Sequence, residues 1–203
     1  MIYLSSAQTA YIVVLVVAVL VIVALIVLLF IKNKYRPKHI RELTYIKLHH
    51  FCEANDYLLL NNYRINIDDS NIGIIDHVVI SNKFIIIIND FPISGVLTGD
   101  YSSENLSIYN KQGAGAIVNP LNYNINLAKR LALFNDLSQE LLRGLVVINS
   151  DSKLNITNNS NQFRIIRLNE LKKTIRQFDK SNVKDLKEDD VVRFINYLNN
   201  QNR

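Results

Sequence analysis

The most prominent pattern in the chain is one uninterrupted apolar run over residues 10–31, without a charged residue, a proline or a glycine. A helix of that length rises about 33 Å, and the hydrocarbon core of a bilayer is about 30 Å thick. A cleaved signal peptide would instead have a basic segment before a shorter apolar core. The run therefore predicts a single transmembrane helix over residues 10–31.

The charges that flank this run predict its orientation. Residues 32–41 carry five cations and no acid, whereas residues 1–9 contain no Lys or Arg. Since positively charged flanks stay on the cytoplasmic side, we expect residues 1–9 outside the cell membrane and residues 42–203 in the cytoplasm. Residues 32–41 then form a basic juxtamembrane linker, which can attract anionic headgroups of the lipid bilayer.

The rest of the chain alternates between helical and strand-like patterns. Helices are predicted at residues 37–54, after Asn119-Pro120, and near residues 170–178 and 187–198. Strands are predicted at residues 57–67, 72–80, 84–88, 145–148 and 163–168. Residues 95–99 and 101–109 suit either strand or loop, while residues 113–115 and 151–162 are expected to be loops. This order predicts an α/β fold, a mixed sheet flanked by helices.

The overall charge of +5 does not by itself indicate a nucleic-acid partner. It comes from 23 basic and 18 acidic residues, and the five cations of the linker account for the whole excess. The domain after the linker is therefore near neutral, although phosphate binding usually shows as a basic patch. The single cysteine, Cys52, excludes an internal disulfide, and its place in the pattern suits a small apolar residue on a helix face.

Asp76 interrupts an otherwise apolar strand. A carboxylate in such a place costs several kcal/mol unless it is paired or bound to a metal. Two interpretations follow: a structural aspartate with a protein partner near a strand end, or a metal ligand.

Several motifs around Asp76 resemble a known family. The run Ile75-Asp76-His77-Val78-Val79-Ile80-Ser81 precedes an apolar strand, then Gly95-Val96-Leu97-Thr98-Gly99, then Asn119-Pro120-Leu121 before a helix. Residues 57–62 match a first strand. In this arrangement the sequence is similar to the nuclease-related domain (NERD) family of the PD-(D/E)xK nuclease superfamily, from about Glu42 to the last helices.

The resemblance implies a restriction-endonuclease-like sheet and a metal-dependent site. In the family, Ile-Asp-His lies on one strand and Glu-x-Lys on the next, so that Glu and Lys share one face. The two acids would hold Mg²⁺ or Mn²⁺, and the Lys would position the attacking water. An upstream helical Glu often completes the site, and by position this is Glu42.

The chain departs from the family pattern at the decisive positions. Counting back from Gly95, the family Glu falls on Asn89 and the family Lys on Phe91. A register one residue later offers Asp90 but places proline at the Lys position. The candidate catalytic residues, vestigial or active, are therefore Asp76, Asn89, Asp90 and Glu42, with Asp76 and Asp90 as candidate metal ligands.

Three hypotheses about function follow. The leading one is a membrane-anchored, inactive NERD-like domain, a pseudoenzyme that needs no cofactor and acts as a binding or scaffolding module for an unidentified protein. The alternative is an active metal-dependent DNA nuclease that uses Asp76, Asp90 and Glu42 with a basic residue from elsewhere, such as Lys111 or Lys129. The third is a structural subunit of a membrane complex without a role in nucleic-acid chemistry.

Overall fold

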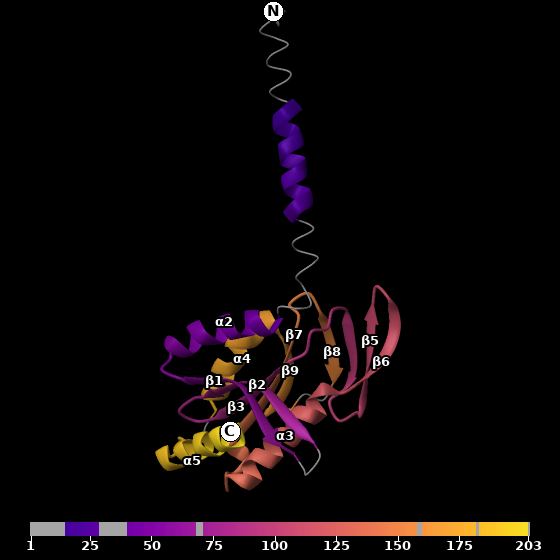
Figure 1. Cartoon of the computed structure of the whole chain (residues 1–203). Helices are drawn as coiled ribbons and strands as arrows, with labels where there is room; N and C mark the ends of the chain where they lie inside the picture. Colours follow the sequence, from indigo (N-terminus) through magenta and orange to yellow (C-terminus); the bar gives the residue numbers. More distant parts are fainter. Residues whose placement is uncertain (1–14, 29–39, 68–70, 158–159, 182, 203) are drawn as a thin grey trace, which may run out of the picture. The chain divides into compact units, whose positions relative to one another are not determined.

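The computed structural model describes residues 15–28, 40–67, 71–157, 160–181 and 183–202 (Figure 1). The chain divides into two compact units, Met1–Lys38 and His39–Arg203. In the first unit the described residues 15–28 are helical. Within the described ranges, no helix combines the length and the apolar character needed to cross a membrane. The other parts of the predicted span, residues 10–14 and 29–31, lie outside the described residues, as do residues 1–9 and 32–39.

The second unit is built on a five-stranded sheet. Its order is β1 (Leu58–Asn66), β2 (Ile72–Ile80), β3 (Ile85–Asp90), β7 (Leu142–Ile148) and β9 (Phe163–Arg167). The first three strands form an antiparallel meander, and β7 and β9 continue the sheet in parallel with β3. The central strand β3 is buried on both faces, with Ile85 to Ile88 fully inaccessible, as its uniformly apolar sequence predicts.

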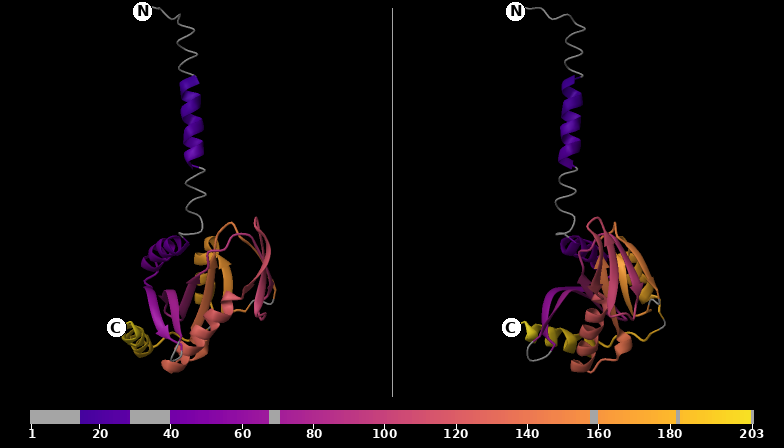
Figure 2. Two further views of the ribbon diagram at one scale, coloured as in Figure 1. Left: turned by 45° about the vertical axis from the view of Figure 1, so that its right-hand side comes forward. Right: turned by 90° about the vertical axis from the view of Figure 1, so that its right-hand side faces the viewer.

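Helices cover both faces of this sheet (Figure 1 and Figure 2). On one face α2 (Ile40–Glu53) and α4 (Leu171–Asp179) bury apolar residues against Val79, Ile86 and Ile88. On the other face α3 (Pro120–Phe134) and α5 (Glu188–Gln201) pack against Val78, Ile80, Ile85 and Ile87. The alternation of side chains along β2 and β3 thus supplies two cores.

A second, four-stranded sheet lies beside the first. Its order is β6 (Gly113–Val118), β5 (Asn105–Asn110), β4 (Val96–Asp100) and β8 (Lys153–Thr157), with β4 and β8 parallel. Leu97 and Leu106 from this sheet pack against Val146 and Ile148 of β7 in a third core. Two short 3₁₀ turns, η1 (Gln139–Leu141) and η2 (Leu168–Glu170), complete the regular elements.

The second sheet corrects three predictions. The expected single sheet is two sheets, the expected loop at residues 113–115 belongs to β6, and the expected loop at residues 151–162 contains β8. The strand β6 is rich in Gly and Ala, which have weak strand propensity, and it is fixed by its pairing with β5. In β8, Leu154 and Ile156 alternate with polar residues and pack against the third core, so this strand could have been recognised from its period of two.

Candidate functional site

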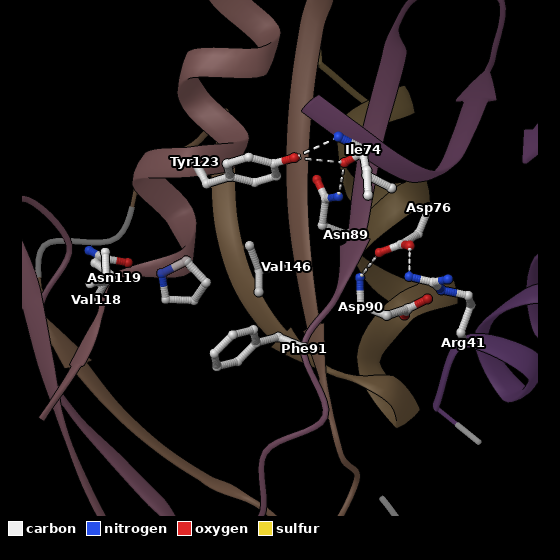
Figure 3. Close-up of a pocket in the computed structure, with 11 residues that line it drawn as sticks. Arg41, Ile74, Asp76, Asn89, Asp90, Phe91, Val118, Asn119, Tyr123 and Val146 are labelled. Carbon is white, nitrogen blue, oxygen red and sulfur yellow. Dashed lines mark hydrogen bonds and ion pairs between the residues drawn. The ribbon is translucent and has the colours of Figure 1, made fainter. Parts of the chain in front are cut away.

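The candidate residues gather at a pocket of about 340 Å³ beside the ends of β2 and β3 (Figure 3). Its wall combines a few polar groups with several apolar side chains. The lining residues are Arg41, Ile74, Asp76, Asn89, Asp90, Phe91, Val118, Asn119, Pro120, Tyr123 and Val146. The pocket therefore contains three of the four predicted site residues, and the fourth, Glu42, is exposed on α2 and does not line it.

The start of α3 forms one wall of the pocket. Asn119 caps this helix, because its side-chain oxygen accepts a hydrogen bond from the Leu121 N–H at 3.1 Å. Its amide group donates to the carbonyl oxygens of Tyr101 and Ser103, at 3.0 and 2.9 Å. Pro120 occupies the first helical turn, where a missing N–H costs nothing. The Asn119-Pro120 motif thus joins α3 to the loop after β4 and fixes the wall.

Asp76 is buried on β2 and is held by two protein groups. Its side chain is 5 % exposed, its Oδ2 accepts the Asp90 backbone N–H at 2.8 Å, and its Oδ1 forms an ion pair with the Arg41 guanidinium. Burial raises the pKa of Asp76, while the Asp90 N–H and the Arg41 charge act against that rise. The two partners from within the chain therefore offset part of the cost of burying this carboxylate.

Asp90 carries a second set of buried hydrogen bonds. Its Oδ1 accepts from the Thr44 hydroxyl at 2.6 Å, and its Oδ2 lies 2.9 Å from His77 Nε2. The other ring nitrogen, Nδ1, lies 2.6 Å from Asn61 Oδ1. Both ring nitrogens of His77 thus lie within hydrogen-bond distance of side chains on the neighbouring strands β1 and β3. The contact between His77 and Asp90 is buried, with both side chains 2 % exposed.

Asn89 and Phe91 occupy the positions at which the family pattern has Glu and Lys. The Asn89 amide donates to the Ile74 carbonyl oxygen at 2.8 Å, and its oxygen accepts from the Asn124 amide at 3.0 Å. Tyr123 also bonds to Ile74, accepting from its N–H at 2.6 Å and donating to its carbonyl oxygen at 3.2 Å. Phe91 contributes an apolar ring to the wall. The side chains of Asn89, Phe91 and Tyr123 line the pocket and bring no charge to it.

The arrangement of donors does not fit a divalent cation. Each of the four carboxylate oxygens of Asp76 and Asp90 already faces a donor from the chain, namely Arg41, the Asp90 N–H, Thr44 or His77. Mg²⁺ and Mn²⁺ need such oxygens as ligands. Within the described ranges no three His, Cys, Asp or Glu side chains gather in a way that could hold a metal. Metal binding at this place would require Arg41 and the other donors of the chain to move away from the carboxylate oxygens.

The sequence did not predict the roles of Arg41, Thr44 and His77. Arg41 falls within the predicted basic linker, but it lies on α2 and reaches Asp76. Thr44 is a polar residue of the predicted helix and gave no signal of its own. Strand alternation places the side chains of Asp76 and His77 on opposite faces, yet both bond to Asp90, one at its N–H and the other at its carboxylate. The rival basic residues Lys111 and Lys129 do not line the pocket.

Comparison with known proteins gives one match. The family model described as the nuclease-related domain, NERD, matches residues 39–149, which is more than half of the 203 residues. No curated protein and no solved structure matches the chain. The matched segment runs from α2 to the end of β7 and includes every residue that lines the pocket.

Proposed function

The chain belongs to the nuclease-related domain family, and from this premise we propose that it is a catalytically inactive member. Its role is that of a binding or scaffolding module at the cytoplasmic face of the cell membrane. The observation that carries the proposal is that every carboxylate oxygen of Asp76 and Asp90 already faces a group of the chain itself, through an ion pair or a hydrogen bond.

The charges of the site support inactivity. In a metal-dependent nuclease a divalent cation balances the carboxylates and stabilises the charge that develops on the phosphate. Here the Arg41 guanidinium faces Asp76, and the Thr44 hydroxyl and the His77 ring face Asp90, so groups of the chain itself occupy the surroundings of both carboxylates. The positions of the family Glu and Lys hold Asn89 and Phe91, and neither can carry charge.

The pocket supports a binding role. Phe91, Pro120 and Val146 give it apolar walls, and Val118 and Tyr123 are 70 % and 40 % exposed at its border. A pocket of about 340 Å³ with such walls can take an apolar side chain of a partner protein. Arg41, with its side chain 57 % exposed, offers a polar contact at the border.

Attachment to the membrane rests on the sequence. The apolar run of residues 10–31 and the five cations of residues 32–41 support a single-pass anchor with the domain in the cytoplasm. An anchored module would concentrate its partner at the membrane surface. A structural subunit of a membrane complex would share the anchor, and it would differ in being permanently bound to its neighbours.

One observation favours the nuclease alternative. Arg41 places a cation beside Asp76, where the family lysine is missing. A guanidinium does not release its proton in proteins, so Arg41 cannot accept a proton from water. Its contact with Asp76 also competes with metal binding. The alternative therefore needs both a metal and a displacement of Arg41.

The inactivity is tested by incubating the full-length chain with linear and circular DNA in Mg²⁺ or Mn²⁺. We expect no more cleavage than with the Asp76→Ala variant purified in the same way. Metal-dependent cleavage that disappears in Asp76→Ala would establish the nuclease alternative.

The binding role is tested with a photo-crosslinker at position 123 in intact membranes. We expect a discrete crosslinked protein that is lost in Val118→Asp and retained in Lys129→Gln, an exposed change on α3 away from the pocket. Equal crosslinking in both variants would contradict a role for the pocket.

A further inference from the structure

A second cavity of about 330 Å³ lies between α4 and the strand β9. It shares no lining residue with the first pocket, and all of its lining residues follow residue 149, beyond the family match. Most of its wall is polar. The lining residues are Leu154, Ser160, Asn161, Arg164, Ile165, Ile166, Glu170, Lys173, Thr174 and Gln177.

Two neutral side chains of this wall, Ser160 and Gln177, present hydrogen-bond donors. Ser160 Oγ accepts two backbone N–H groups, from Gln162 at 3.0 Å and Phe163 at 3.3 Å, so its own hydroxyl proton remains to be donated. The Gln177 oxygen accepts from Arg164 at 3.0 Å, which leaves the Gln177 amide protons for another acceptor. Both side chains therefore offer protons to a ligand.

The charged groups of the wall also offer donors to a ligand and few acceptors. The Glu170 oxygens are both taken by Arg167, one by its side chain at 2.6 Å and the other by its backbone N–H at 3.0 Å, and this pairing lowers the pKa of Glu170. Lys173 forms no ion pair with another described residue, and Arg164 keeps guanidinium protons beyond those it gives to Gln177 and to the Ser160 carbonyl oxygen. The cavity is thus rich in donors, and its single carboxylate is satisfied.

The surroundings of the cavity are basic. Residues 160–187 contain eight cations and three acids, in a domain that is near neutral as a whole. Three exposed cations lie on α4, and a fourth follows its last residue: Lys172, Lys173, Arg176 and Lys180. Of the three acids, Glu170 is paired with Arg167, and Asp179 accepts the Tyr57 hydroxyl at 2.7 Å. The potential at the mouth of the cavity therefore favours anions.

We propose that this cavity binds a phosphate monoester. Such a group carries about 1.5 to 2 negative charges and three acceptor oxygens at neutral pH, which matches two cations and several neutral donors around one confined space. The cavity volume leaves room for the organic part of the ester. A nucleic-acid backbone would instead call for a continuous groove along which successive phosphates meet cations. The monoester can come from a free metabolite or from a phosphorylated lipid headgroup.

The test uses the full-length chain in nanodiscs of phosphatidylcholine. Glycerol 3-phosphate is titrated while the thermal unfolding midpoint and the amide NMR signals of residues 160–177 are followed. We expect saturable binding that raises the midpoint, with glycerol as the uncharged control. In Lys173→Gln, and in Gln177→Glu, which places a carboxylate in the cavity, the affinity should fall about tenfold or more. Lys129→Gln, an exposed helical lysine elsewhere, should bind like the unaltered chain.

Two further arms decide the source of the phosphate and the rival partner. If the lipid headgroup is the better ligand, nanodiscs that contain phosphatidylinositol 4-phosphate should displace glycerol 3-phosphate from the cavity. If the free ester is the better ligand, glycerol 3-phosphate should stay bound in the presence of these nanodiscs. Either result supports a monoester site. The proposal would be overturned if neither glycerol 3-phosphate nor the lipid headgroup binds, or if Lys129→Gln and Lys173→Gln lower the affinity equally. It would also be overturned if duplex DNA binds in a way that depends on Lys173 while neither monoester binds.

Discussion

Removal of the Arg41 charge is the most informative perturbation of the site. In Arg41→Gln, the buried Asp76 loses its cationic partner but keeps the Asp90 N–H. Breaking a fully buried ion pair costs about 3–5 kcal/mol, whereas an exposed pair contributes about 0–1 kcal/mol. Since Asp76 is buried and the Arg41 side chain is 57 % exposed, we predict a loss of about 1–2 kcal/mol in the free energy of unfolding at pH 7.

The dependence of this loss on pH identifies its origin. Burial raises the pKa of Asp76 in the folded chain above its value in the unfolded chain. The protonated form of Asp76 therefore contributes its full stability at pH values below the unfolded pKa, and this contribution is lost as the pH rises through the folded pKa. Without Arg41 the folded pKa rises further. The difference between the variant and the unaltered chain should therefore be small near pH 4 and reach its full size near pH 7.

The assay is chemical unfolding of the full chain in a neutral detergent, followed by near-ultraviolet circular dichroism of the tyrosines. Arg41→Lys serves as the control, because it keeps the charge and should recover part of the loss. An equal loss at both pH values, or a larger loss at pH 4, would refute an electrostatic role of Arg41 toward Asp76.

Three other predictions concern the fold and its orientation. Burial raises the pKa of Cys52 to about 11, so the thiol should react with a disulfide reagent at pH 8 far more slowly in the folded chain than in the unfolded chain; equal rates would contradict its burial. Gly144→Ala should cost about 1–3 kcal/mol in an unfolding experiment, because the added methyl would collide with the Asn124 side chain, and an unchanged midpoint would contradict this packing. With Cys52 unreactive, a cysteine at Ser5 should be labelled by an impermeant reagent in intact cells and one at Asn161 only after lysis; labelling at Asn161 in intact cells would reverse the proposed orientation.

The local elements of the main sheet could be predicted from the sequence. The uniformly apolar Ile85–Ile88 run indicated a strand buried on both faces, and these residues are fully inaccessible. The Asn119-Pro120 pair indicated the start of a helix, and α3 begins there. Cys52 lies on the buried face of α2, as its pattern suggested. In each case the signal is contained within a few neighbouring residues.

The second sheet and the charge pairing of the site depend on contacts between distant segments. The small residues of β6 have a weak preference for a strand, so this strand depends on its pairing with β5. In that pairing Gly115 lies opposite Ile108. The contact of Arg41 with Asp76 joins a helix to a strand 35 positions further along the chain. The positive-inside rule already accounts for a basic residue after an apolar run, so nothing in the sequence indicated that Arg41 also contacts Asp76.

Inactivity of the site is tested most directly by a calorimetric titration of the full-length chain with Mn²⁺. We predict no saturable heat of binding at pH 7 for the unaltered chain, because Arg41, Thr44, His77 and the Asp90 N–H contact the carboxylate oxygens of the site. Saturable Mn²⁺ binding that is abolished in Asp76→Ala would show instead that the site holds a metal.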